Sequence, residues 1–134
     1  MSEAAILLVD DEKLILDSLK EQLRMRFGGR FVYETAENVD EAWEVFDELE
    51  SEGTSVVVVV SDWLMPGVRG DEFLEEVWER WPAVVRIMLT GQADESALER
   101  ARSSHVHRIL HKPWRAEELA GAILTGLGSS APIS

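Results

Sequence analysis

Polar residues that could do chemistry stand at or just beyond the ends of short, mainly apolar runs of this sequence. Asp10 and Asp11 follow one such run, and Asp62 follows a run of five valines. Two later apolar runs lead in the same way to Thr90 and to Lys112. Carboxylates without histidine or cysteine favour a hard ion, Mg²⁺ before Ca²⁺, while a hydroxyl and an ammonium group would complement an anion. This combination indicates phosphoryl chemistry, in which a carboxylate attacks phosphorus while the cations neutralise its oxygens.

The elements that must position these groups alternate between strands and helices. Short apolar runs rich in β-branched residues are typical of strands that are buried on both faces. Apolar residues at helical spacing, such as Leu16, Leu19 and Leu23, indicate amphipathic helices. The sequence predicts strands over 4–9, 31–35, 56–60, 84–89 and 108–110. It predicts helices over 13–26, 38–51 (with Asn38 as N-cap), 70–80, 95–103 and 115–127.

Five strand–helix units in alternation predict an α/β fold. The expected form is a flavodoxin-like (βα)5 sandwich, whose five-stranded parallel sheet has the order 2-1-3-4-5 and carries helices on both faces. Ligands of such sheets bind beyond the carboxyl ends of the strands, at the switch point between strands 1 and 3. The carboxylates, the threonine and the lysine all follow strands, so we expect them to meet at this edge.

The composition limits the classes of function that are possible for this chain. A chain of 134 residues, 46% of them hydrophobic, suits one domain with a sizeable core, and the lack of cysteine excludes disulfides and thiolate metal sites. A net charge of −13 argues against direct binding to nucleic acid or to a membrane surface. No targeting or membrane-spanning segment is visible, which favours a cytoplasmic protein. Residues 31–79 hold 15 acids and 1 base, which predicts that the acidity lies on one side of the molecule.

The motifs themselves are familiar. They are Asp10-Asp11, Ser-Asp-Trp-Leu-Met-Pro-Gly over 61–67, Gly70, Leu89-Thr90-Gly91 and His111-Lys112-Pro113-Trp114. In this order and spacing, over about residues 4–127, the chain resembles the receiver domain of response regulators in two-component signalling systems. We therefore expect a receiver domain over residues 1–127, followed at 128–134 by a flexible tail or the start of a linker.

The resemblance implies a role for each matching position. Asp62 would be the phospho-acceptor, which takes a phosphoryl group from a phosphohistidine or from a small phosphodonor. Lys112 would hold one phosphoryl oxygen, and Thr90 would bond another once the acyl phosphate forms. Mg²⁺, with Mn²⁺ as a substitute, would be bound directly by Asp11 and Asp62 and through water by Asp10.

The resemblance also implies a set of residues around this pocket. The backbone carbonyl of Leu64 would complete the metal shell. The bond before Pro113 would be cis. Four side chains are expected to flank the pocket: Trp63, Gln92, Pro113 and Trp114.

Some positions depart from the usual family pattern. Ile109 stands where many members carry the aromatic residue that switches together with the threonine. Leu64 occupies a position that is often polar, and Gln92 follows Thr90 by two residues. Glutamine can orient a hydrolytic water whereas leucine cannot, so we expect this pair to set the lifetime of the phosphoryl group. The side chains of His107 and His111 are expected at the surface.

The expected function is a phosphorylation-activated switch rather than an enzyme, since it would catalyse only its own phosphorylation and dephosphorylation. Phosphorylation would change the face formed by 95–103, 108–110 and 115–127. Expected partners are a sensor histidine kinase or phosphotransfer protein and an unidentified output partner or fused output domain, with a phosphorylation-dependent homodimer as a further state. The alternatives are a degenerate receiver that docks without phosphorylation and a phosphatase with an aspartate nucleophile. The phosphatase would need an Asp-x-Asp pattern after the first strand, where the chain has Asp10-Asp11-Glu12.

Overall fold

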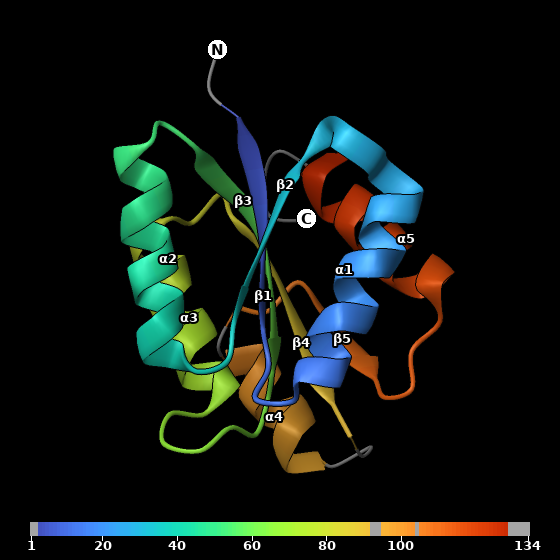
Figure 1. Cartoon of the computed structure of the whole chain (residues 1–134). Helices are drawn as coiled ribbons and strands as arrows, with labels where there is room; N and C mark the ends of the chain where they lie inside the picture. Colours follow the sequence, from blue (N-terminus) through green and yellow to red (C-terminus); the bar gives the residue numbers. More distant parts are fainter. Residues whose placement is uncertain (1–2, 92–94, 104, 129–134) are drawn as a thin grey trace.

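Five parallel strands form one sheet at the centre of the computed structural model, which describes residues 3–91, 95–103 and 105–128. The order is β2-β1-β3-β4-β5, as predicted (Figure 1). The strands are β1 (Ala4–Val9), β2 (Val32–Ala36), β3 (Ser55–Asp62), β4 (Val85–Thr90) and β5 (Arg108–His111). The helices are α1 (Lys13–Phe27), α2 (Val39–Ser51), α3 (Gly70–Arg80), α4 (Glu95–Ser103) and α5 (Ala116–Gly128), and a short 3₁₀ turn, η1 (Gly28–Arg30), follows α1.

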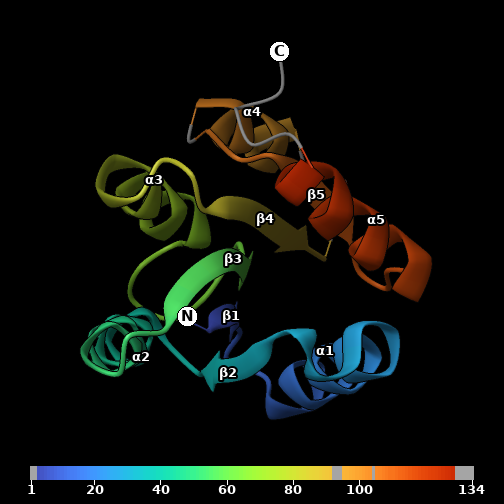
Figure 2. The same ribbon diagram turned by 90° about the horizontal axis from the view of Figure 1, so that it is seen from above.

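The sheet separates two layers of helices, α1 and α5 on one face and α2, α3 and α4 on the other (Figures 1 and 2). The valine run of β3 shows why both faces are apolar. Val58 and Val60 pack in the cluster with α1 and α5, while Val59 packs in the cluster with α2 and α3. Since successive residues of a strand point to opposite faces, an uninterrupted valine run is what a doubly covered central strand requires.

The observed elements differ from the predicted ones mainly at their ends. The third strand continues past its valines to Asp62, because Asp62 pairs with Leu89 and the Trp63 N–H donates to the Leu89 carbonyl at 2.9 Å. The fourth strand likewise reaches Thr90, and the fifth reaches His111. Asp62 and Thr90 are therefore terminal residues of their strands rather than loop residues, so the sheet fixes their backbones.

Two local expectations have different outcomes. Asn38 caps α2 as predicted, since its side chain accepts the Glu41 N–H at 2.8 Å. The surface assignment is right for His111, which is exposed, but wrong for His107. The His107 ring is half-buried, and its Nδ1 accepts the Arg86 N–H at 3.0 Å. Burial lowers the pKa of His107, and the nearby Arg86 guanidinium lowers it further.

Candidate functional site

Three carboxylates meet at the carboxyl edge of the sheet. Oxygens of Asp10, Asp11 and Asp62 all lie within 4.8 Å of one another. The topology explains this, because β1 and β3 are hydrogen-bonded neighbours although 52 residues separate Asp10 from Asp62. Asp10 is fully buried and its Oδ1 accepts the Glu12 N–H at 2.9 Å, while Asp11 is exposed. The cluster thus has a buried floor and an open side.

Lys112 brings a cation to this cluster from the loop after β5. Its Nζ lies 3.2 Å from Asp10 Oδ2 and 3.1 Å from Asp62 Oδ1. The Lys112 N–H also donates to the Thr90 carbonyl at 2.8 Å, which fixes the start of this loop against β4. The Lys112–Pro113 bond is cis, as the resemblance implies. The side chains predicted from strands 1, 3 and 5 therefore do converge.

Charges are unevenly balanced in the cluster. Burial, with the neighbouring Asp10 charge, raises the pKa of Asp62 to about 6, although Lys112 opposes the shift. Burial also raises the pKa of Asp10. For Lys112, burial alone would lower the pKa, but the Asp62 and Asp10 carboxylates outweigh it and raise the pKa. A single lysine thus faces three acids, and the remaining negative charge with oxygen-only donors fits a hard divalent cation.

Thr90 ends β4 next to this cluster. It is buried, and its neighbour in β5 is His111, one residue before Lys112. A hydroxyl on β4 and an ammonium group after β5 thus lie on the side of the cluster away from β2. This is the arrangement that the sequence predicts for holding an anion at Asp62.

The loop from β3 to α3 is tied closely to the end of β3. The Trp63 N–H is shared between the Leu89 carbonyl and Asp62 Oδ1, at 2.9 and 3.0 Å. The Trp63 carbonyl accepts the Gly70 N–H at 2.7 Å. A Cβ at Gly70 would collide with the Asp62 carbonyl oxygen, so only glycine allows α3 to begin this close to β3.

The residues predicted to flank the site are placed differently from one another. The Trp63 side chain is buried beside Asp62, and the Leu64 side chain is 60% exposed. Trp114 is half-buried and donates its indole N–H to Gln22 of α1 at 2.7 Å; with Pro113 and Lys112 it lines a hollow beside α1. Gln92 lies outside the described residues. Ile109, in place of an aromatic residue, is half-buried against the α2–α3 layer.

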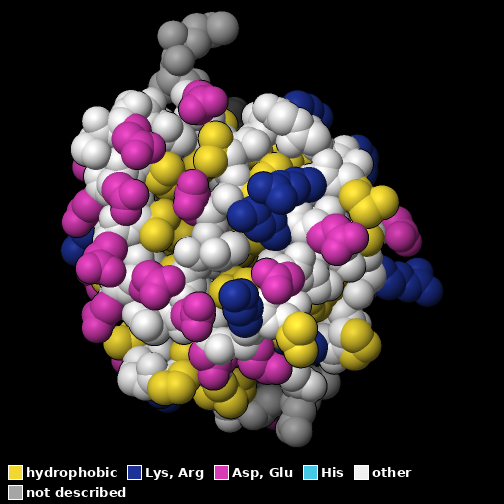
Figure 3. All heavy atoms as spheres, viewed as in Figure 1, with side chains coloured by type: hydrophobic (Ala, Val, Ile, Leu, Met, Phe, Trp, Pro, Cys, Tyr) yellow, Lys and Arg dark blue, Asp and Glu magenta, His cyan; other side chains and the backbone are white. Residues whose placement is uncertain are grey.

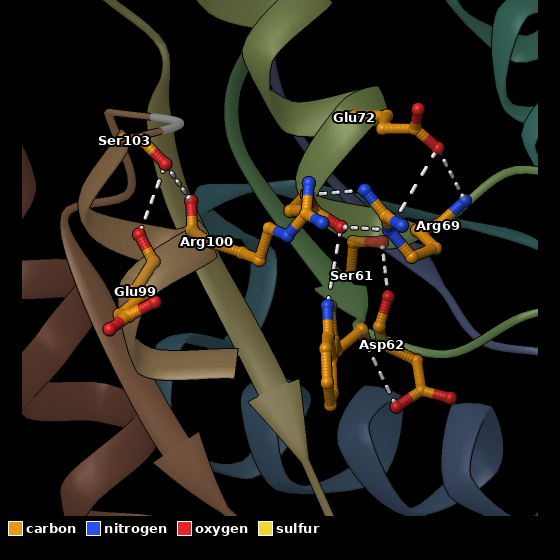
Figure 4. A network of polar contacts seen from close by, with 9 residues as sticks. Ser61, Asp62, Arg69, Glu72, Glu99, Arg100 and Ser103 are labelled. Carbon is orange, nitrogen blue, oxygen red and sulfur yellow. Dashed lines mark hydrogen bonds and ion pairs between the residues drawn. The ribbon is translucent and has the colours of Figure 1, made fainter. Parts of the chain in front are cut away.

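Sequence reasoning missed two residues of the network beside Asp62, namely Asp71 and Arg69. The buried Asp71 accepts the Trp63 indole N–H at 3.2 Å and the Arg69 Nε–H at 3.0 Å (Figure 4). Acidic residues are common in the first turn of a helix, so the presence of Asp71 there did not indicate a functional role. The one available hint was Trp63, because a buried indole N–H requires an acceptor.

The charged side chains are unevenly spread on the face that Figure 3 shows. Acidic side chains gather over α2, whereas lysine and arginine side chains lie among acids over α1. Within the described residues, every helix is too short or too polar to cross a membrane.

Known proteins are similar to this chain in sequence and in fold. The family model of the response regulator receiver domain matches residues 6–124. The hydrogenase transcriptional regulatory protein HoxA of Cupriavidus necator is 34% identical over 122 residues, which are 90% of this chain but only 23% of that protein. The chemotaxis protein CheY homolog of Campylobacter jejuni is 29% identical over 132 residues, covering 94% of this chain and 97% of that protein.

Solved structures agree with these relatives. A response regulator receiver domain protein from Clostridium thermocellum superposes with a TM-score of 0.81 at 30% identity, covering 93% of this chain and 94% of that one. Receiver domains are switches in phosphorylation-dependent signalling rather than classical enzymes. Since the family model spans nearly all of the described residues, the chain belongs to the response regulator receiver domain family.

Proposed function

We propose that the chain is a phosphorylation-activated switch and that Asp62 is its phospho-acceptor. One observation carries the proposal: Asp62 Oδ1 is held by Lys112 at 3.1 Å and by the Trp63 N–H at 3.0 Å, beside two further carboxylates. An aspartate that only capped a turn would need neither the lysine nor the acids. Thr90, buried at the end of the neighbouring strand β4, is the residue whose hydroxyl we assign to the phosphoryl group.

The chemistry follows from the two oxygens of Asp62. Since Oδ1 is bound, Oδ2 is assigned the attack on phosphorus. Its electron pair forms an O–P bond while the P–N bond of a phosphohistidine breaks and leaves its electron pair on the imidazole; with acetyl phosphate, a P–O bond breaks and acetate leaves. Lys112 then neutralises a phosphoryl oxygen and Thr90 donates to another. Later attack of water on phosphorus restores the carboxylate and releases inorganic phosphate.

The acidic cluster would hold a divalent cation during this reaction. Asp11 and Asp62 are the proposed direct ligands, with Asp10 acting through water and Leu64 through its carbonyl. When bound, Mg²⁺ or Mn²⁺ neutralises phosphoryl oxygens and so lowers the barrier to attack by a carboxylate. The buried Asp10 would also orient the cluster, since it contacts Lys112 and accepts the Glu12 N–H.

Phosphorylation would be read out on α4, β5 and α5. An added phosphoryl group would draw Thr90 and Lys112 toward Asp62. Thr90 ends β4, and Lys112 directly follows β5, so both lie beside this face. The added charge then biases an existing two-state equilibrium rather than creating a new state. Because Ile109 stands where many family members carry an aromatic residue, we expect this switch to depend on side-chain packing rather than on rotation of an aromatic ring.

We infer the phosphodonor and the output partner from the family to which the chain belongs. The phosphodonor is a histidine kinase or a phosphotransfer protein, and the output is a fused domain or a separate protein, with a phosphorylation-dependent homodimer as one active form. The one-sided acidity supports a protein partner over nucleic acid or a membrane, in a cytoplasmic setting. Fusion is supported by relatives such as HoxA, of which the chain spans 23%.

The deciding experiment is intact-mass analysis after incubation with acetyl phosphate and Mg²⁺. The native chain is expected to gain one phosphoryl group, and Asp62→Asn is expected to gain none. Asp47→Asn, an exposed acid of α2, is the matched control and should behave as the native chain does. No mass gain in the native chain would support the degenerate receiver instead. Sustained phosphate release from a phosphomonoester would support the phosphatase.

A further inference from the structure

A buried network ties the residue after Asp62 to the first turn of α3. Asp71 is 2% exposed and lies at the second position of α3. Its Oδ1 accepts two hydrogen bonds, from Trp63 Nε1 at 3.2 Å and from Arg69 Nε at 3.0 Å. Its Oδ2 accepts from the Arg69 guanidinium at 3.4 Å. A carboxylate removed from water in this way acts as a fixed anchor for both donors.

The anchored residue, Trp63, is also held through its backbone. Its N–H is shared between the Leu89 carbonyl and Asp62 Oδ1, and its carbonyl accepts the Gly70 N–H. With its indole bound to Asp71, Trp63 is therefore held at three separate points. The bond to Asp71 thus adds a side-chain anchor to the residue whose backbone N–H contacts Asp62. Asp71 is thus connected to the attacking carboxylate through a single residue.

The network also closes the loop that follows Asp62. Residues 63–69 leave β3 and return to α3, and the Trp63 indole bonds Asp71 across the mouth of this loop. Arg69, labelled in Figure 4, pairs with Asp71 at the α3 end of the same loop. Leu64, whose carbonyl is proposed to face the metal, lies inside the closed segment. Its side chain is 60% exposed and cannot anchor the loop by packing. The orientation of this carbonyl therefore depends on the anchors on either side.

We propose that Asp71 is a positioning residue for phosphoryl acceptance, holding Trp63 and Arg69 so that the Trp63 N–H and the loop carbonyls face the Asp62 site. This inference rests on the proposed function of Asp62. It assigns Asp71 no contact with the phosphoryl group. Asp71 would act by holding the loop in position, and small displacements of reacting groups have large effects on rate.

The variants separate the two hydrogen-bonding partners of Asp71. Asp71→Leu removes both. Asp71→Asn keeps an acceptor for the indole but loses the charge that faces Arg69, and Trp63→Phe removes only the indole donor. Asp40→Asn is the matched control, because Asp40 holds the same second position in α2 but is exposed. Any general effect of an acid at a helix N-terminus is therefore shared by both sites.

The first readout is the rate of phosphorylation by acetyl phosphate at saturating Mg²⁺. A titration of Mg²⁺ also gives the concentration at which this rate is half-maximal. Asp71→Leu is expected to lower the rate about tenfold and to raise the half-maximal concentration, with a smaller loss in Asp71→Asn and none in Asp40→Asn. The losses in Asp71→Leu and Trp63→Phe should not add in the double variant, because both break the same contact.

The second readout is the indole ¹H–¹⁵N resonance of Trp63, assigned by its disappearance in Trp63→Phe. It should shift and exchange faster with water in Asp71→Leu, yet stay near its native position in Asp71→Asn. Native rates in a folded Asp71→Leu variant would overturn the proposal; if that variant does not fold, native rates in both Asp71→Asn and Trp63→Phe would overturn it. A native chain that takes up no phosphoryl group would instead refute the function of Asp62 itself.

Discussion

Asp62 is subject to opposing influences on its charge. Burial and the Asp10 carboxylate favour its protonated form, whereas Lys112, 3.1 Å away, favours the ionised form. The first two prevail and raise the pKa to about 6. The proposed nucleophile must be ionised to attack, so we expect Asp62 to react when a cation balances the charge of the cluster. Because burial in the fold raises this pKa, the ionisation of Asp62 is linked to the stability of the fold.

We expect this linkage to appear in the pH dependence of unfolding without divalent metal. The folded state holds the Asp62 proton more tightly than the unfolded chain, so this contribution to stability is present at low pH and lost as pH rises through about 6. The loss is on the order of 2–3 kcal/mol. His107, with a lowered pKa, acts in the opposite direction, so the informative quantity is a difference between proteins.

Urea midpoints of the native chain and of Asp62→Asn, measured in EDTA from pH 4 to pH 8, test this linkage. The variant should gain stability relative to the native chain as pH rises, because it lacks the carboxylate that must ionise. Excess Mg²⁺ should reduce this difference by stabilising the native chain. Parallel pH profiles of the two proteins would contradict the assignment.

Leu64 provides a second prediction for a single residue. Its exposed side chain lies two residues beyond the proposed phospho-acceptor and has no group that could orient water. Leu64→Asn should speed loss of the phosphoryl group by about three- to tenfold, and Gln92→Ala should slow it. The decay of the phosphorylated mass after removal of acetyl phosphate gives both rates. Unchanged decay in both variants would show that this pair does not control the lifetime.

Among the elements, the contact between the end of β3 and the start of α3 matters most for the site. It depends on Gly70, where a Cβ would meet the Asp62 carbonyl, a backbone group that cannot rotate away. The Gly70 N–H also bonds the Trp63 carbonyl at 2.7 Å. The helix can approach the strand closely only because this position has no side chain.

Gly70→Ala is therefore expected to lower the free energy of unfolding by about 1–3 kcal/mol or more. It should also slow phosphorylation, since the clash falls on Asp62, the proposed phospho-acceptor. Gly121→Ala in α5 is the control, because a Cβ there meets nothing within 4 Å. That change should stabilise the protein by roughly 0.5–1 kcal/mol. Equal midpoints for both variants in urea unfolding would rule out a tight contact at Gly70.

For the whole molecule, the distribution of charge separates two sides. Acids gather over α2 (Figure 3). By contrast, α1 begins beside the site with the exposed residues Lys13 and Leu14. Like charge repels a partner, and an exposed apolar residue is favourable in an interface. A protein phosphodonor should therefore approach along α1 rather than α2.

This asymmetry can be tested with Leu14→Glu on α1 and Glu44→Lys on α2, both at exposed positions. Transfer from a phosphorylated histidine phosphotransfer domain should slow about tenfold in Leu14→Glu and stay near native in Glu44→Lys. Phosphorylation by acetyl phosphate should be the same in both, because a small donor needs no docking surface. Slower transfer in Glu44→Lys alone would place the docking surface on α2.

The sequence by itself determined the fold class, the strand order and the residues that converge. Apolar runs that end in Asp10, Asp62, Thr90 and Lys112 carry this information locally, because strand burial and strand ends are set by neighbouring residues. The topology of a parallel sheet then brings these ends to one edge.

Only the tertiary structure decided the ion pairs of Lys112, the half-burial of His107 and the network of Asp71. Asp71 resembles any acid in the first turn of a helix until α3 is placed against β3. Its burial results from the approach that Gly70 permits, and its partner Trp63 lies on the other side of the loop. Such contacts depend on distances between separate elements, and the pattern of residues along one element does not contain them.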